Sequence, residues 1–146
     1  MANEIVKSEE ITEEITPIDT ENPVKGMYSS FKGESREERL TIFEAVTNAE
    51  RLEDHLNEKI SVQHVIIQPV RMVDRVSGEV REGNRIVLCG SDGIAYACMS
   101  EGVETAIKQL FGIVGMPPWN PPIDFKAVKQ QGRNAYKFTT LQLWKD

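Results

Sequence analysis

The fold is decided by residues 60–98, which read ISVQHVIIQPVRMVDRVSGEVREGNRIVLCGSDGIAYAC. The first fifteen of them alternate between two faces and are rich in β-branched side chains, which predicts one long strand from Ile60 to Asp74. Pro69 interrupts this strand and indicates a bulge or a sheet edge. A second strand is expected over residues 85–89 and a third over residues 94–98, joined by a tight turn.

A helix and a second hairpin are expected after the third strand. Ser100 is a good N-cap, and the apolar residues that follow it at helical spacing predict a helix with one buried face. The proline-rich stretch 116–122 cannot be a helix or a central strand, so we expect a loop there. Residues 123–130 and 135–144 are expected to form the fourth and fifth strands, with a turn between them.

This order of elements predicts a mainly β fold. Three antiparallel strands, a helix and a two-stranded hairpin, with an unusually long first strand, are the elements of an OB-fold, a five-stranded, partly open antiparallel barrel. Ahead of the barrel we expect a strand and helix extension. The strand is expected at residues 40–46 and the helix from Asn48 to Leu56, preceded by a capping box of Ser35 with Glu38. A small α+β sandwich built from the same elements is the alternative.

Length and composition indicate a single globular domain. The chain has 146 residues, of which 40% are hydrophobic, and this is enough apolar material for a core. No apolar run approaches the roughly 20 residues that span a bilayer, and the N-terminal residues do not resemble a signal peptide. Two cysteines cannot form a disulfide framework. We therefore expect a protein of the cytoplasm, without a membrane partner.

The net charge of −6 is located in one segment. Residues 1–24 contain seven acidic residues and one lysine, whereas residues 25–146 contain equal numbers of acids and bases. Because this segment offers little apolar surface, we expect residues 1–24 to be a disordered acidic tail and residues 25–146 to be the folded domain.

Signatures of catalysis and of metal binding are absent from the sequence. His55 and His64 are the histidines, and Cys89 and Cys98 lie nine residues apart, which is not a zinc-ligand spacing. The glycines do not form a phosphate-binding loop. We therefore expect no enzyme activity and no cofactor, with the cysteines as core thiols.

Basic residues interleaved with aromatic rings indicate a binding surface. Single-stranded nucleic acid needs cations for its phosphates and flat rings on which bases stack. Acidic residues on the same hairpins could instead pair with the cations, and strand aromatics are often core, so a solvated surface over an ordinary core is the alternative. The candidates are Arg71, Arg75, Arg85, Lys129 and Arg133 for phosphates, and Tyr96, Trp119 and Tyr136 for bases.

The stretch from Ile42 to Leu143 resembles the single-stranded DNA-binding proteins of small protein-primed tailed phages of Gram-positive bacteria. The matching residues occur in the same order along both chains. They are Ile42-Phe43-x-Ala45, Leu52, Leu56, Ile60, Gln68, Asp92-Gly93-x-x-Tyr96-x-x-x-Ser100, Phe125, Val128, Gln130, Gly132 and Phe138-x-x-Leu141-Gln142-Leu143.

The resemblance implies an OB-type protein that coats and protects displaced single strands during replication of a phage or mobile element. It also places Tyr96 on a family tyrosine that lies near the bound strand. The chain departs from the family at Pro69, which follows Gln68 where a relative has an aromatic residue. The loop around Trp119 looks like an insertion, and the acidic tail is longer than the family requires.

Two further functional hypotheses follow from the sequence. The acidic tail competes with DNA for the cations or docks replication proteins; the alternative is a tail that only keeps the protein soluble. The rival function is a protein–protein adaptor that uses the barrel surface and the Pro-Pro-Trp-Asn-Pro-Pro loop, residues 117–122, as its docking surface.

Overall fold

The computed structural model of the protein describes residues 11–15, 27–133 and 137–145. The two α-helices are α1 (Arg36–Asn48) and α2 (Glu101–Ile113), and a short 3₁₀ helix, η2, spans Leu52–His55. The strands are β1 (Ile11–Ile15), β2 (Tyr28–Ser29), β3 (Glu50–Arg51), β4 (Ile60–Val62), β5 (His64–Asp74), β6 (Val80–Cys89), β7 (Ala95–Cys98), β8 (Ile123–Gln131) and β9 (Lys137–Leu143).

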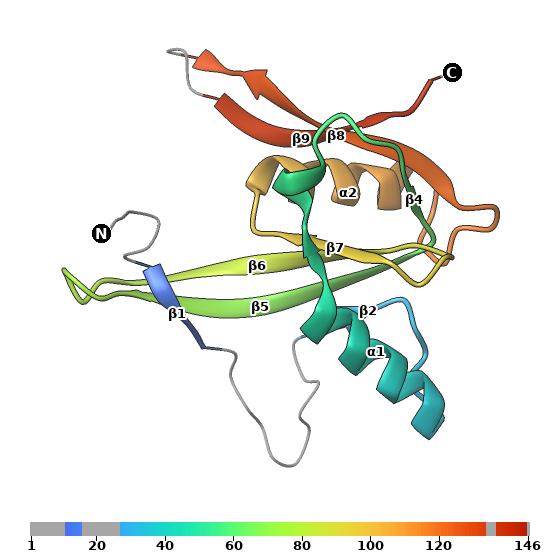
Figure 1. Ribbon diagram of the computed structural model, residues 1–146, viewed down its shortest axis with the longest axis horizontal. Coiled ribbons are helices and arrows are strands. Elements are labelled where there is room, and N and C mark those ends of the chain that lie inside the picture. Colours follow the sequence, from blue (N-terminus) through green and yellow to red (C-terminus); the bar gives the residue numbers. More distant parts are fainter. Residues whose placement is uncertain (1–10, 16–26, 134–136, 146) are drawn as a thin grey trace.

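Within the described residues the strands form two sheets (Figure 1). The larger sheet has the order β1-β5-β6-β7-β3, with β2 also beside β5, and the smaller has the order β4-β8-β9. The strand predicted from Ile60 to Asp74 is present but divided at Gln63. Its first part, β4, pairs with β8, and its second part, β5, pairs with β6 over ten residue pairs. The chain therefore passes from one sheet to the other within a single extended stretch.

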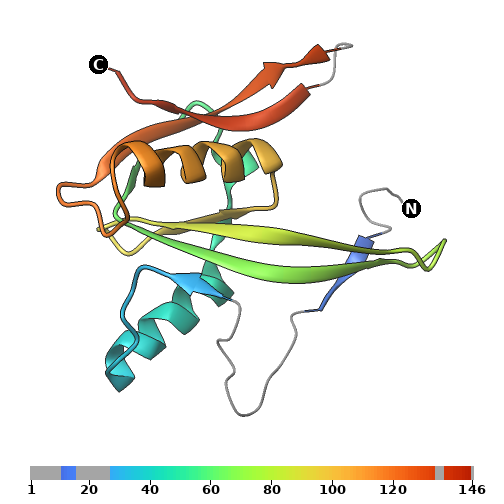
Figure 2. The same cartoon turned by 180° about the vertical axis from the view of Figure 1, so that it is seen from behind.

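Helix α2 lies between the two sheets, and α1 lies on the opposite side of the larger sheet (Figures 1 and 2). The main core fills the space around α2, and its fully buried side chains include Leu52, Ile86, Leu88, Ile107 and Phe125. Removing each of these side chains from water contributes about 1.5–3 kcal/mol. The smaller sheet, α2 and the inner face of the larger sheet are thus held together as one unit.

A second, smaller core lies beneath α1. On β6, Ile86 and Leu88 belong to the main core, whereas Val87 and Cys89 belong to the cluster against which α1 packs. Because successive strand side chains point to opposite faces, both faces of β6 are covered. This explains the continuous apolar run at residues 86–89.

The sequence prediction was wrong for residues 40–56. Residues 40–46 belong to α1 rather than to a strand, and residues after Asn48 form β3 and η2 rather than an α-helix. The predicted capping box is confirmed, since Ser35 accepts a hydrogen bond from the backbone of Glu38 and the Glu38 side chain accepts from the backbone of Ser35. It begins a helix of 13 residues. Of the apolar residues in this stretch, Ile42, Ala45 and Val46 pack at helical spacing onto the second core, whereas Leu40 is exposed.

The mainly β architecture and the predicted order of strands and helix after residue 60 are confirmed. In the described part of the chain, however, β7 and β9 do not pair, so the sheets remain open. The arrangement is compatible with a barrel-like fold, and the OB-fold itself stays a prediction. Pro69 is tolerated in β5 because β1 and β2 pair with β5 on either side of it and leave a gap at its position.

The acidic tail differs in part from its prediction. Residues 11–15, expected to be disordered, form β1, which pairs with residues 71–74 of β5. The other residues of the predicted tail lie outside the described residues. Backbone pairing with the edge of a long hairpin orders a segment whose side chains alone predict disorder.

Gly102 allows α2 to approach β9 closely. A Cβ atom at this position would overlap the carbonyl oxygen of Thr139 and press against the Phe138 ring at 2.9 Å. We expect Gly102→Ala to lower the free energy of unfolding by about 1–3 kcal/mol, because the helix and the strand must separate. Urea denaturation measures this change.

The matched control is Gly112→Ala in the same helix, where nothing lies within 4 Å of the new Cβ atom. Alanine is the better helix former, so this variant should be as stable as the wild type or more stable. Equal stability of the two variants would contradict the close approach at Gly102.

Candidate nucleic-acid interface

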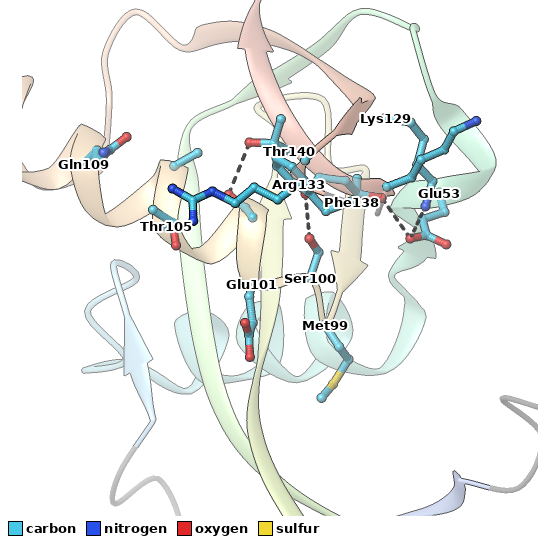
Figure 3. Close-up of a pocket in the computed structure, with 15 residues that line it drawn as sticks. Glu53, Met99, Ser100, Glu101, Thr105, Gln109, Lys129, Arg133, Phe138 and Thr140 are labelled. Atoms are coloured by element: carbon cyan, nitrogen blue, oxygen red, sulfur yellow. Dashed lines mark hydrogen bonds and ion pairs between the residues drawn. The ribbon is translucent and has the colours of Figure 1, made fainter. Parts of the chain in front are cut away.

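A groove of about 780 Å³ lies between the N-terminus of α2 and the β8–β9 hairpin (Figure 3). It occupies the side of the molecule where the two sheets do not join. The residues that line it are Glu53, Met99, Ser100, Glu101, Gly102, Thr105, Ala106, Gln109, Lys129, Gly132, Arg133, Lys137, Phe138, Thr139 and Thr140.

Three exposed cations come to the groove from the β8–β9 hairpin. Lys129 lies on β8 opposite Thr139, and Lys137 opens β9 opposite Gln131. Arg133 lies in the connection between these strands. Because antiparallel pairing brings the two ends of a hairpin together, cations eight residues apart in the sequence share one wall of the groove.

Hydrogen bonds fix the opposite wall. The Ser100 hydroxyl donates to the carbonyl oxygen of Thr139 at 2.6 Å, and the Thr140 hydroxyl donates to the carbonyl oxygen of Gly102 at 3.2 Å. Ser100 is also the N-cap of α2, as predicted, since its side chain accepts from the backbone of Val103. The start of α2 is therefore attached to β9, and the groove has a defined width.

Phe138 supplies an aromatic side chain to the groove. It is partly exposed on β9, opposite Gln130 of β8, and the described residues that line the groove include no second aromatic ring. A flat ring beside cations is the combination that single-stranded nucleic acid uses for stacking. The sequence analysis missed this residue. Its position between the cation Lys137 and two threonines, rather than among apolar residues, is the signal that could have identified it.

Glu53 places a carboxylate among the cations. It accepts a hydrogen bond from the hydroxyl of Thr139 at 3.0 Å, and the Nζ atom of Lys129 lies 3.4 Å from the same oxygen. Arg51 lies 3.6 Å from the other oxygen. Burial alone would raise the pKa of the Glu53 carboxyl, but the Thr139 hydrogen bond and the charges of Lys129 and Arg51 outweigh it and lower the pKa.

A second hollow, of about 520 Å³, continues from the groove and shares Glu53, Met99 and Ser100 with it. It is lined by Arg51 and by Arg85 of β6. Arg85 is half-buried and donates to the backbone oxygen of Val46 at 3.0 Å and to Gln68 at 3.4 Å. Cationic side chains therefore line both the groove and the hollow that adjoins it.

The structure brings together some of the predicted phosphate-binding residues. Lys129 and Arg133 line the groove, and Arg85 lines the adjoining hollow. Arg75 is exposed in the turn after β5 and does not line either hollow. The backbone of Arg71 pairs with Glu82 in the β5–β6 hairpin, and its side chain lies outside the description. Tyr136 also lies outside the described residues.

Trp119 and Tyr96 contribute to the core rather than to the groove. Trp119 is only 5% exposed, its indole N–H donates to the carbonyl oxygen of Gly115 at 2.9 Å, and it packs near Phe125. This corrects its placement as a stacking residue, because its ring faces are covered by protein. Tyr96 is half-buried against the main core, with its ring edge-on to His55 at 5.0 Å between centroids.

The cysteines and histidines have structural surroundings. Burial raises the pKa of the Cys89 thiol to about 12 and that of the Cys98 thiol to about 11, so both stay neutral. The hydroxyl of Ser30 lies 2.9 Å from Nδ1 of His64, and Phe31 stacks on this ring. Among the residues described, no group of histidine, cysteine and carboxylate side chains could hold a metal ion.

The mainly β fold and a groove lined by three cations and an aromatic side chain fit a protein that binds an extended polyanion. A family model described as phage single-stranded DNA-binding protein matches residues 21–144. The chain therefore belongs to the phage single-stranded DNA-binding protein family, as the resemblance from Ile42 to Leu143 predicted. It is a family of DNA-binding proteins, and it makes single-stranded DNA the expected partner.

The other comparisons gave no match, either among curated proteins or among solved structures. No helix in the described part of the chain is long and apolar enough to cross a membrane.

His55 makes folding stability depend on pH. Its ring nitrogens lie 2.9 Å from Glu58 and 2.6 Å from Glu50. The Glu58 hydrogen bond, together with the bond to Glu50, raises the His55 pKa against the effect of burial. A raised folded-state pKa means that this stabilisation is complete below the unfolded value of about 6.5 and is lost as the pH rises through the folded value.

We therefore expect the wild type to lose more unfolding free energy than His55→Gln between pH 6 and pH 8. Urea denaturation of both proteins at each pH measures the difference. An identical pH dependence of the two proteins would contradict a charged His55 in the native state.

Proposed function

We propose that the protein binds single-stranded DNA without sequence preference in the groove between α2 and the β8–β9 hairpin. The observation that carries this proposal is that Lys129, Arg133 and Lys137 line the same groove as the partly exposed Phe138. The cations would contact the phosphates, and the ring would stack on a base. Since every base has a flat face, stacking of this kind tolerates any sequence.

The charge balance of the groove predicts moderate affinity. Three cations line it, together with the carboxylates of Glu53 and Glu101. Each neutralised phosphate of a single strand contributes about 0.7 to the slope of log affinity against log salt concentration. With few such contacts, the slope should be shallow.

Replacing two groove cations tests the phosphate contacts. We expect the double variant Lys129→Gln/Arg133→Gln to bind oligothymidylate roughly tenfold or more weakly at low salt and to reduce the salt slope by about 1.4. The anisotropy of a labelled oligonucleotide measures both quantities. Intrinsic tryptophan fluorescence is the weaker readout, because Trp119 is buried away from the groove.

Arg36→Gln is the control for the removal of positive charge. Arg36 is exposed at the start of α1, on the other side of the larger sheet from the groove. This variant should bind as the wild type does. Equal weakening by the control and the double variant would contradict a specific site at the groove.

Replacing the groove aromatic tests stacking. Phe138→Ala should weaken binding by about 1–3 kcal/mol, whereas Phe138→Tyr, which keeps a flat ring, should retain most of the affinity. Circular dichroism and urea denaturation establish that both variants are folded. If the folded alanine variant binds as tightly as the wild type, Phe138 does not stack on DNA, and Tyr96 or Tyr136 becomes the next candidate.

The biological role that fits this activity is the coating and protection of displaced single strands during replication of a phage or mobile element in the host cytoplasm. The family match supports it. The acidic N-terminal segment would dock replication proteins or compete with DNA for cations. Protection of a displaced strand from a nuclease, at protein concentrations that saturate oligonucleotide binding, tests the coating role directly.

The adaptor hypothesis finds less support. Trp119 and Pro117 of the proline-rich loop are buried, so the loop packs on the core and does not present its aromatic ring to a partner. An adaptor would also have no need for the cations that gather beside Phe138. Binding to oligonucleotides discriminates between the two functions.

A further inference from the structure

One hydroxyl and two cations converge on one carboxylate where the groove meets the adjoining hollow. The Thr139 hydroxyl and the Lys129 ammonium lie 3.0 Å and 3.4 Å from the same oxygen of Glu53, and the Arg51 guanidinium lies 3.6 Å from the other (Figure 3 shows the first two). These residues come from η2, β3, β8 and β9. The protein therefore builds an anion-binding arrangement and fills it with its own side chain.

The position of Glu53 is unexpected for a groove that receives a polyanion. Its carboxylate neutralises Lys129, one of the cations that line the groove, and it would repel a backbone phosphate. It is also partly accessible, with a side chain that is 40% exposed, so solvent and ligand can reach it. Exposed ion pairs of this length stabilise a protein by only about 0–1 kcal/mol, and a phosphate can compete for the cation.

Glu101, the other carboxylate in the groove, differs from Glu53. It is exposed in the first turn of α2, where the helix dipole favours a negative charge, and it makes no ion pair with another described residue. The Glu101 carboxylate thus stabilises the start of α2, whereas the Glu53 carboxylate forms an ion pair with a cation of the groove.

We propose that the Glu53 carboxylate holds the place of a DNA phosphate in the free protein and yields Lys129 and Arg51 to the phosphate when a strand binds. The inference rests on the proposed function and assigns a residue that limits affinity. The ion pair with Glu53 holds the Lys129 side chain, which is 44% exposed, at the groove. Arg51 lines the adjoining hollow, its side chain is 75% exposed, and it also lies 3.8 Å from Asp54. Glu53 thus orients Lys129 before binding and weakens the complex at the same time.

Neutralising Glu53 tests the inference. Glu53→Gln keeps an oxygen that can accept the Thr139 hydrogen bond and removes the charge. We expect it to bind oligothymidylate about 3–10 times more tightly than the wild type at low salt, because no ion pair has to break before Lys129 contacts a phosphate. Glu101→Gln removes the same charge from the same groove and measures the general electrostatic part of the gain.

A double-mutant cycle tests whether Lys129 is the cation that exchanges Glu53 for a DNA phosphate. In the Lys129→Gln background, Glu53→Gln should increase affinity by a clearly smaller factor than in the wild type. The inference is overturned if this factor is the same in both backgrounds, or if Glu53→Gln binds no more tightly than Glu101→Gln. If neither the wild type nor any variant binds the oligonucleotide at low salt, the proposed function fails, and this inference fails with it.

Discussion

The extended stretch from Ile60 to Asp74 belongs to both sheets, and the rest of the structure depends on this division. At the break, the backbone N–H of Gln63 donates to the carbonyl oxygen of Cys89 at 2.8 Å, and the Gln63 carbonyl accepts from the N–H of Trp119 at 2.9 Å. Backbone groups that leave a sheet need partners, and these two bonds provide them. The chain can therefore pass from one sheet to the other within a single residue, Gln63. The two sheets separate from each other at this position.

The groove is a consequence of this divergence. Helix α2 fills the space between the sheets, and in the described part of the chain β7 and β9 do not pair to close the far side. The bonds from Ser100 to Thr139 and from Thr140 to Gly102 join α2 to β9 there. Backbone and side-chain groups that a closed barrel would cover instead line a depression that carries the hairpin cations. The open side of the two sheets and the groove are thus one structural feature.

Aromatic residues divide between core and groove according to their neighbours in space. Trp119 was predicted to stack on bases as one of the aromatic residues interleaved with cations, yet its ring enters the main core. Tyr96 alternates onto the inner face of β7, where it meets His55. Phe138, which was not among the predicted stacking residues, lines the groove. Alternation along a strand shows which residues share a face, but it does not show which face is covered.

Local patterns in the sequence determined the strands after Ile60, the helix that begins at Ser100, the capping box at Ser35 and the family, because periodicity, caps and motif order are properties of neighbouring residues. The tertiary structure decided the rest. Residues 40–46 are helical since α1 finds a second core to cover, and β1 is ordered by pairing with β5. Glu53 meets Lys129 and Thr139 across 76 and 86 residues of chain. Contacts over such separations exist only after the sheets have assembled, so no local pattern could reveal the carboxylate that occupies the groove.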